Sequence, residues 1–211
     1  MSPKQPTAGI ILAAGESIRF GKPKQLLKLN DKYLLEWVLD AALGSRLEKI
    51  LLILGHKYQA ILTALGEKTR HPDLQIVNNH HYQDGQSTSL QAGLDQVRDK
   101  FPAAMFLLGD QPMLDSETID ALLEQFWISG KDIGVPVFKG KRGNPVIFAQ
   151  KFYDHMAKIS GDIGARNIIR NHLENVEEIE INNPLCFMDI DTQSDLDNLS
   201  ELLNTPKNCN D

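Results

Sequence analysis

The segment from Leu12 to Lys24 combines small residues and positive charges in a pattern suited to binding phosphate. Its letters are LAAGESIRFGKPK. The small side chains at positions 13–15 let a ligand approach the backbone closely, so that amide groups can face phosphate oxygens. Arg19 and Lys24 then add full positive charges. This chemistry predicts a site for a small anionic ligand that carries phosphate groups.

Two well-known phosphate loops do not fit this segment. A Walker A loop has four residues between its glycines, followed by Lys and then Ser or Thr. Here five residues separate Gly15 from Gly21, and Pro23 follows Lys22. The dinucleotide fingerprint G-x-G-x-x-G fails as well, because Ser17 occupies the place of its second glycine. Neither a P-loop ATPase nor a standard NAD-binding module is therefore predicted.

Carboxylates at two predicted strand ends could hold a divalent cation. The letters LLGDQP place Asp110 after an apolar run, where a carboxylate can bind Mg²⁺ together with phosphate oxygens and water. Opening a turn is the alternative role for this residue. In the later letters MDIDTQSD, Asp189 and Asp191 would point the same way on an extended strand, so either could be the partner. Thr192 or Ser194 could also cap the helix that follows.

Short apolar runs alternate with helical periodicity over the first two thirds of the chain, which predicts βαβ units and a mostly parallel α/β sheet covered on both faces. Strands are expected at residues 9–13, 50–54, 74–77, 103–108, 133–137, 145–148, 176–181 and 186–190. Helices are expected at residues 33–43, 58–65, 87–97, 116–126, 150–157, 164–173 and 195–203, with Ser116 as an N-cap. Ligands bind at the carboxyl ends of such strands. The loops at Gly15, at residues 78–86 and at residues 109–112 should therefore meet at one edge.

The composition indicates a globular protein that binds small molecules. With 211 residues, the chain can bury a large core without a disulfide or a structural metal. A net charge of −6 argues against nucleic-acid binding, which needs a basic face. One basic cluster suits a small anion better than a polymer, and it comprises Arg19, Lys22, Lys24, Lys28 and Lys32. For Lys28 and Lys32, a solvated helix face is the alternative.

The cysteines and the N-terminus predict a cytoplasmic protein. Cys186 and Cys209 lie far apart and outside any C-x-x-C pair, which fits a reducing compartment. The apolar run at residues 9–14 is too short for a signal peptide, and no run is long enough to span a membrane.

The loop as a whole resembles the signature L-A-A-G-x-(G/S)-x-R-M-G-x-x-K of a nucleotidylyltransferase family. Within that family, the sequence is most similar to the molybdenum cofactor cytidylyltransferases and their guanylyltransferase relatives. Residues 12–24 match at nearly every position, and Phe20 stands where methionine is usual. The resemblance implies a Rossmann-like three-layer α/β/α fold with a mostly parallel mixed sheet. It also implies a single domain at 1–204, with a nucleotide-binding half at 9–112, an acceptor-binding half at 113–204 and a frayed tail at 205–211.

The resemblance assigns nucleotide contacts to the first half of the chain. The residues that would wrap the nucleotide are Leu12, Ala13, Ala14 and Gly15, and Gly109 joins them from the second loop. Ala14 favours CTP over GTP, because guanylyl relatives often carry glycine there. Ser89, in the letters GQSTSL, is the candidate for contacting the base or ribose. Ser87 in the same turn is equally suited to capping the helix.

The resemblance also assigns the chemistry of transfer. Arg19 and Lys24 would neutralise the triphosphate, and Lys24 is the best candidate to stabilise charge on the α-phosphate. Asp110 corresponds to the metal ligand of the family's G-D-x-P motif. Asp191 matches the second ligand position better than Asp189. The expected ion is Mg²⁺, with Mn²⁺ as an alternative.

Two segments of the second half resemble motifs attributed to the side that meets the acceptor. Residues 143–148 read GNPVIF, where Asn144 departs from the family's usual histidine. Residues 161–166 read GDIGAR, in which Gly164 to Arg166 could present amides and a guanidinium to a phosphate. A capped helix with a surface arginine is the alternative for that segment.

The resemblance predicts transfer of CMP from CTP to molybdopterin with release of pyrophosphate. A different phosphorylated acceptor, or GTP as donor, belongs to the same enzyme class. Two competing functions lie outside that class: an NAD(P)-dependent oxidoreductase, and a non-catalytic protein that binds molybdenum cofactor or nucleotide. A recipient molybdoenzyme or its chaperone is an expected protein partner, whereas nucleic acid and membrane are not expected.

Overall fold

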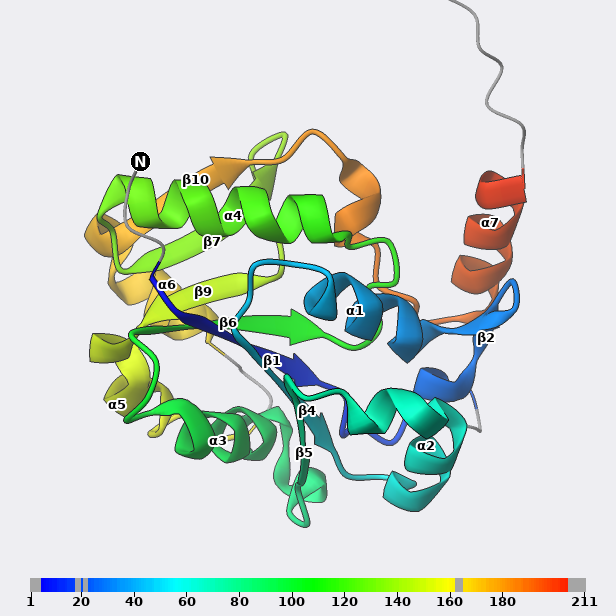
Figure 1. Ribbon diagram of the computed structural model, residues 1–211. Coiled ribbons are helices and arrows are strands. Elements are labelled where there is room, and N and C mark those ends of the chain that lie inside the picture. Colours follow the sequence, from blue (N-terminus) through cyan, green and yellow to red (C-terminus); the bar gives the residue numbers. More distant parts are fainter. Residues whose placement is uncertain (1–4, 18–19, 21–22, 162–164, 205–211) are drawn as a thin grey trace, which may run out of the picture.

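Eight strands form the central sheet of the computed structural model, which describes residues 5–17, 20, 23–161 and 165–204 (Figure 1). Seven follow one path in the order β10-β7-β9-β6-β1-β4-β5, and β8 pairs with β7. The strands are β1 (Thr7–Leu12), β4 (Lys49–Leu54), β5 (Leu74–Asn78), β6 (Ala103–Leu108), β7 (Ile133–Phe138), β8 (Lys141–Arg142), β9 (Val146–Ala149) and β10 (Val176–Glu180). Along the path, β9 is antiparallel to both neighbours and the other pairs are parallel. The sheet is mixed and mostly parallel, as predicted.

Apolar side chains on both faces of the strands bring helices to two sides of the sheet. In β4, Leu51 and Leu52 belong to different core clusters, because successive side chains of a strand point to opposite faces. The first cluster takes in α1 (Leu34–Leu43), α2 (Tyr58–Leu65) and α4 (Ser116–Ser129), and the second takes in α3 (Gln86–Val97), α5 (Tyr153–Met156) and α6 (Arg166–Asn171). Figure 1 shows α4 and α3 on opposite sides of the sheet. The predicted three-layer α/β/α fold is confirmed.

A small hairpin and the last helix form a third cluster at one end of the molecule. The hairpin pairs β2 (Lys28–Leu29) with β3 (Lys32–Tyr33), and two-residue strands of this kind leave no periodicity to detect in the sequence. Leu29 of the hairpin is buried together with Leu196 and Leu199 of α7 (Gln193–Asn204). This packing holds two segments of the chain in place. One is the segment that carries Lys24, before the hairpin, and the other is the segment that precedes α7.

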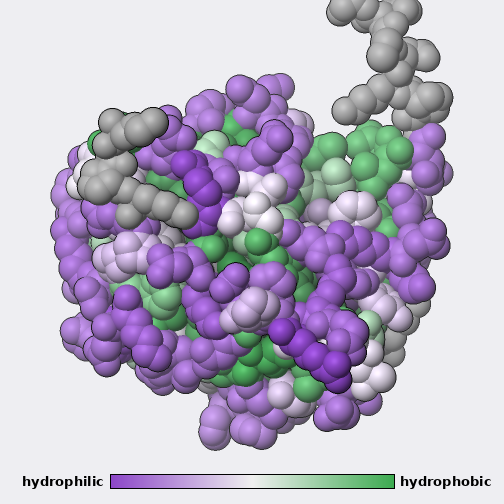
Figure 2. Space-filling view, in the orientation of Figure 1, coloured by the Kyte–Doolittle hydropathy of each residue, from purple (hydrophilic) through white to green (hydrophobic). Residues whose placement is uncertain are grey.

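Polar side chains cover most of the face seen in Figure 2. An apolar patch at the upper right of that view lies over α7, where Leu202 and Leu203 are 53% and 36% exposed. Across the described ranges, no helix has both the length and the apolar character that crossing a membrane requires.

The strand predicted at residues 186–190 was wrong. A 3-10 helix, η7 (Pro184–Phe187), occupies its first part, and the rest is irregular. The Ile190 backbone N–H donates to the carbonyl oxygen of Asp110 at 3.0 Å, so this segment is held by the loop after β6 instead of by a neighbouring strand. The apolar letters reflect burial in the core, because Cys186 belongs to the first cluster and Ile190 to the third.

The N-cap predicted for α4 was wrong by one residue. Asp115 is the cap, because its carboxylate accepts a hydrogen bond from the Thr118 backbone N–H at 2.7 Å and Ser116 begins the helix. The other predicted helices and strands are confirmed to within a few residues, although the helix predicted at 150–157 divides into η5 (Gln150–Phe152) and α5. The division into two functional halves stays a prediction, and the tail at 205–211 lies outside the described residues.

Candidate functional site

A cavity of about 790 Å³ opens at the carboxyl ends of β1 and β6. We call it the carboxylate cavity, and residues that line it include Gly15, Ser17, Tyr82, Gly85, Asp110 and Asp191. The loop after β1, the segment before α3 and the loop after β6 all contribute to this lining. The prediction that these three loops meet at one edge of the sheet is confirmed.

Lys24 joins the two acidic residues of the carboxylate cavity. Its Nζ donates to Asp110 Oδ2 and, at 3.2 Å, to Asp191 Oδ1. Lys24 is the first residue of a 3-10 helix, η2 (Lys24–Leu26), which begins after Pro23. Residues that are far apart in the sequence are thus brought around one ammonium group.

The electrostatic balance at Lys24 favours its charged form. Burial alone would lower the pKa of the Lys24 ammonium, but the charge of Asp110 and the hydrogen bonds to Asp110 and Asp191 outweigh it and raise that pKa. Lys24 is therefore protonated at neutral pH, and it supplies a fixed positive charge where the two carboxylates converge.

The carboxyl group of Asp110 is only partly satisfied. Its Oδ2 contacts Lys24, whereas its buried Oδ1 has no hydrogen-bond partner. A buried carboxylate oxygen without a donor fits a cation ligand. In the described ranges, no cluster of three or more His, Cys, Asp or Glu side chains is placed to bind a metal ion by itself. Two carboxylates suit an ion such as Mg²⁺, which takes its remaining ligands from substrate phosphates and water.

Asp189 and Asp191 occupy different environments. Asp189 accepts a hydrogen bond from Gln111 Nε2 at 2.8 Å, and burial, followed by the nearby charge of Asp110, raises the pKa of its carboxyl group. Asp191 instead contacts Lys24. Thr192 caps α7 as expected, because its hydroxyl accepts a bond from the Asp195 backbone N–H at 3.2 Å. Of the two candidate partners, Asp191 is the one that shares the Lys24 ammonium with Asp110.

A buried glutamine holds the loop after β1 in place. Gln25 is 3% exposed, and its Nε2 donates to the carbonyl oxygens of Ala13 at 2.8 Å and Gly15 at 3.2 Å. Because both partners are acceptors, the amide nitrogen must face them, and this fixes which way the amide group is turned. Gly109 packs behind the same loop, where an added Cβ would lie 2.9 Å from the Ala13 Cβ. The shape of the loop thus depends on residues from outside it.

Unsatisfied polar atoms are concentrated at the carboxylate cavity. Five buried side-chain nitrogen or oxygen atoms in the described part of the chain lack a hydrogen-bond partner, and three of them belong to residues that line this cavity. Those three atoms are Ser17 Oγ, Gln25 Oε1 and Asp110 Oδ1. Folded proteins leave few such groups without a partner, so a polar ligand is expected to supply the missing bonds.

The two serines in the first turn of α3 have distinct positions. Ser89 lines the carboxylate cavity and accepts a bond from Asn79 Nδ2 at 3.0 Å. Ser87 does not cap α3: the N-cap residue is Gly85, with no side-chain cap bond. The Ser87 backbone N–H instead donates to Gly161 O at 3.1 Å. The capping alternative for Ser87 was therefore wrong.

Most predicted site residues that the structure describes come together. Those that line the carboxylate cavity are Leu12, Ala14, Gly15, Lys24, Ser89, Asp110 and Asp191. Ala13 and Gly109 lie behind that lining, where Ala13 N donates to Ile53 O and Gly109 N donates to Leu12 O, each at 3.0 Å. Arg19 and the 162–164 part of the GDIGAR segment lie outside the described residues.

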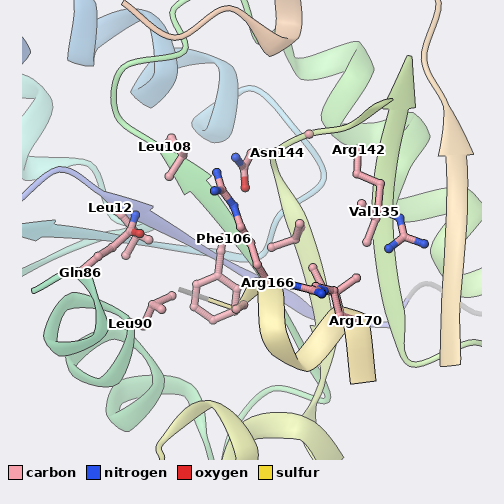
Figure 3. Close-up of a pocket in the computed structure, with 14 residues that line it drawn as sticks. Leu12, Gln86, Leu90, Phe106, Leu108, Val135, Arg142, Asn144, Arg166 and Arg170 are labelled. Carbon is pink, nitrogen blue, oxygen red and sulfur yellow. The ribbon is translucent and has the colours of Figure 1, made fainter. Parts of the chain in front are cut away.

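A second cavity of about 430 Å³ adjoins the first (Figure 3). We call it the arginine cavity, because Arg142, Arg166 and Arg170 line it. Leu12 and Gln86 belong to both cavities. Asn144 and Arg166, from the two segments attributed to the acceptor side, line the second cavity together. The sequence had singled out Arg166 but had missed Arg142 and Arg170.

Comparison with known proteins gives a family match and several relatives. The family model described as the MobA-like NTP transferase domain matches residues 9–176. Purine catabolism protein PucB of Bacillus subtilis is 27% identical over 168 residues, covering 77% of this chain and 80% of PucB. Nicotine blue oxidoreductase of Paenarthrobacter nicotinovorans is 27% identical over 195 residues, covering 87% of this chain and 91% of that protein.

Among solved structures, Rv0371c from Mycobacterium tuberculosis is similar over nearly the whole chain. It is 26% identical with a TM-score of 0.81, covering 93% of this chain and 98% of that one. The same protein has also been solved in complex with manganese, with a TM-score of 0.77.

Proposed function

The chain belongs to the MobA-like NTP transferase family, and we propose that it transfers CMP from CTP to molybdopterin with release of pyrophosphate. Family membership supports nucleotidyltransferase activity as the reaction class. The observation that carries the proposal is the Lys24 ammonium between Asp110 and Asp191, beside a loop suited to phosphate.

The proposed reaction needs positive charge at the α-phosphate. An oxygen of the acceptor phosphate attacks the α-phosphorus in line, the bond to the β-phosphate oxygen breaks, and pyrophosphate leaves. Lys24 turns from the carboxylates to the phosphate oxygens and stabilises the charge that develops there. Arg19 is expected to neutralise the rest of the triphosphate. No covalent intermediate with the protein is required.

Asp110 and Asp191 are the proposed metal ligands. The unpartnered Oδ1 of Asp110 supports this role, as does the shared contact of both carboxylates with one cation. A bound Mg²⁺ or Mn²⁺ would neutralise charge on the triphosphate. The manganese complex of Rv0371c concerns that protein, and it supports testing both ions here.

The choice of nucleotide and acceptor rests on the sequence motifs. Ala14 lines the carboxylate cavity and supports CTP over GTP, and Ser89 is the proposed contact for base or ribose. The segments around Asn144 and Arg166 support a phosphorylated acceptor in the adjoining arginine cavity. A molybdoenzyme or its chaperone is the proposed recipient of the product.

An oxidoreductase is the second candidate, because the chain is 27% identical to nicotine blue oxidoreductase over 195 residues. Ser17, in place of the second glycine of the dinucleotide fingerprint, argues against it. A non-catalytic carrier is a third candidate, and it would bind nucleotide without releasing pyrophosphate. Oxidation of NADH or NADPH, followed by absorbance, would identify an oxidoreductase.

The first test is pyrophosphate release with CTP, GTP, ATP and UTP, each with Mg²⁺ or Mn²⁺ and with or without molybdopterin. We expect release only with CTP and molybdopterin together, and a loss of about a thousandfold in Asp110→Asn. Asp154→Asn is the control, because that exposed carboxylate pairs with Arg98 at 2.6 Å. Tight CTP binding without turnover would mean that the acceptor is wrong, and no binding of any triphosphate would overturn the proposal.

A further inference from the structure

The arginine cavity combines an apolar floor with a cationic rim. Its floor includes Leu90, Phe106 and Val146, and its rim includes the three arginines. An apolar floor suits the flat or hydrophobic body of a small molecule, and guanidinium groups suit carboxylates, phosphates or thiolates. A ligand that satisfies both parts has an apolar body and negative charge.

Two of the three arginines have no acidic partner in the described ranges. Arg46, Arg70, Arg98 and Arg142 each form an ion pair with Asp or Glu. Arg166 and Arg170 form none there, although the chain carries 28 acidic residues. They lie four positions apart on α6, where like charges repel. An anion from outside the chain would remove this repulsion.

The position of these arginines separates them from the reacting centre. Leu12 and Gln86 form the boundary with the carboxylate cavity. Figure 3 shows Arg142 and Arg170 on the opposite side of the arginine cavity, with Phe106 between the two sides. A phosphate that attacks the α-phosphorus has to lie at the boundary, so it leaves Arg170 without an anionic partner, whereas Arg142 keeps its ion pair with Glu178.

We propose that the acceptor carries a second anionic group, apart from the phosphate that reacts, and that Arg170 binds it with help from Arg142 and Arg166. The identity of the reacting phosphate rests on the proposed function, whereas the anion site does not. The substrate class is a flat or apolar body with anionic groups at two separate places. The thiolates of molybdopterin are one group of this kind.

Binding of two simple probes tests the anion site without any turnover. Naphthalene disulfonate is flat and carries two anions, and naphthalene monosulfonate carries one. By titration calorimetry, we expect the disulfonate to bind wild-type protein about tenfold more tightly. That ratio should fall to about twofold or less in Arg170→Gln, and it should persist in Arg170→Lys and in the control Arg98→Gln. An unchanged midpoint of urea denaturation in Arg170→Gln would show that the variant is folded.

Equal affinities for the two probes in wild-type protein, or no binding of either, would overturn the inference. An unchanged ratio in Arg170→Gln would do the same. These results do not depend on whether CTP or molybdopterin is a substrate, so they separate this proposal from the proposed function.

Molybdopterin and its dephosphorylated form then show which anion Arg170 binds. If Arg170 binds the second anion, Arg170→Gln weakens both forms by the same factor of about ten. If it binds the reacting phosphate instead, the dephosphorylated form is not weakened and the inference is wrong. Should wild-type protein bind neither form while the sulfonate result holds, the acceptor named under the proposed function is wrong and the anion site stands.

Discussion

The carboxylate cavity and the arginine cavity share a wall but are built in opposite ways. In the first, the cation of Lys24 is paired with Asp110 and Asp191, and three buried polar atoms lack partners. In the second, the floor is apolar and two cations lack an acidic partner in the described ranges. The first is suited to a ligand that replaces hydrogen bonds and brings a metal ion. The second is suited to a ligand with an apolar body that fits the floor and with negative charge that pairs with the arginines.

This difference predicts that the two cavities can be damaged separately. A change that removes charge or loop support from the carboxylate cavity should weaken nucleotide use and spare anion binding by the arginine cavity. A change at their junction should weaken both. The substitutions below are chosen to break or sharpen that separation.

Lys24→Met should have the largest effect. It keeps an unbranched side chain of similar shape but removes the charge that joins the two carboxylates, so kcat/KM for CTP should fall about a thousandfold. Binding of naphthalene disulfonate should stay unchanged. Pyrophosphate release and calorimetry measure the two quantities. Lys28→Met is the control, because Lys28 contacts the Tyr33 ring, 5.3 Å from its centroid, and does not line either cavity. A parallel loss of disulfonate binding in Lys24→Met would contradict the separation.

Gly85→Ala should disturb both cavities, because it strains the backbone next to Gln86, which lines both of them. Gly85 has a φ of 106°, and an added Cβ would lie 2.9 Å from the carbonyl carbon of Gly161. We expect a loss of about 3 kcal/mol in the free energy of unfolding, measured by urea denaturation. Gly130→Ala is the control: its φ is 66° but nothing lies within 4 Å of an added Cβ, so the loss should be about 1 kcal/mol. Equal losses would mean that the contact with Gly161 contributes nothing.

Gln25→Glu should weaken nucleotide binding through the loop alone. The new carboxylate oxygen would face the carbonyl oxygens of Ala13 and Gly15, and losing two hydrogen bonds there should cost about 2 kcal/mol of CTP affinity, or roughly thirtyfold. Gln91 offers a close control, because its Nε2 also donates to two carbonyl oxygens, those of Ala157 and Ile159. Gln91→Glu should lower stability but leave CTP affinity unchanged.

A split between KM and kcat would identify Gln25 as a positioning residue. Gln25→Glu should raise KM for CTP more than it lowers kcat, since Lys24 and both carboxylates are still present. A loss of stability without any change in CTP affinity would show that the loop does not need this support.

The two cavities also differ in how far the sequence predicts them. Residues 12–24 are contiguous, and their order alone indicates a phosphate loop after a buried strand. The meeting of this loop with Asp110 follows from the rule that parallel strands end at one edge. The function of Gln25 does not follow, because its hydrogen-bond acceptors are fixed only by the folded path of the loop. The signal available in the sequence was the amide residue Gln25, which directly follows the loop-forming segment at residues 12–24.

The arginine cavity is harder to predict because distant elements build it. Arg142 lies on β8, a two-residue strand, and Arg170 lies on the short helix α6. Neither belongs to a motif, and no periodicity connects them. The wrong prediction of a strand at residues 186–190 has a similar cause. The backbone hydrogen bond from Ile190 to Asp110 is a tertiary contact, and the local sequence does not reveal it. Local order therefore predicts the carboxylate cavity well and the arginine cavity poorly.

Asp40→Asn should have the smallest effect and should touch neither cavity. Burial would raise the pKa of the Asp40 carboxyl group, but its hydrogen bonds to Lys32 and Lys68 lower it. A lowered folded-state pKa means that the stabilisation is present above the unfolded pKa and is lost as pH falls through the folded one. Because the side chain is 38% exposed, solvent screening limits this stabilisation to about 0.5 kcal/mol.

Urea denaturation of wild-type protein and Asp40→Asn, at neutral pH and at acid pH, measures this contribution. We expect a small difference at neutral pH that disappears once Asp40 is protonated, and that shrinks in high salt because the pairs are partly exposed. CTP and disulfonate affinities should be the same in both proteins, since Asp40 lines neither cavity. If either affinity changed, charge on the outer side of α1 would reach the site through the sheet, and the separation of the two cavities would not be a purely local property.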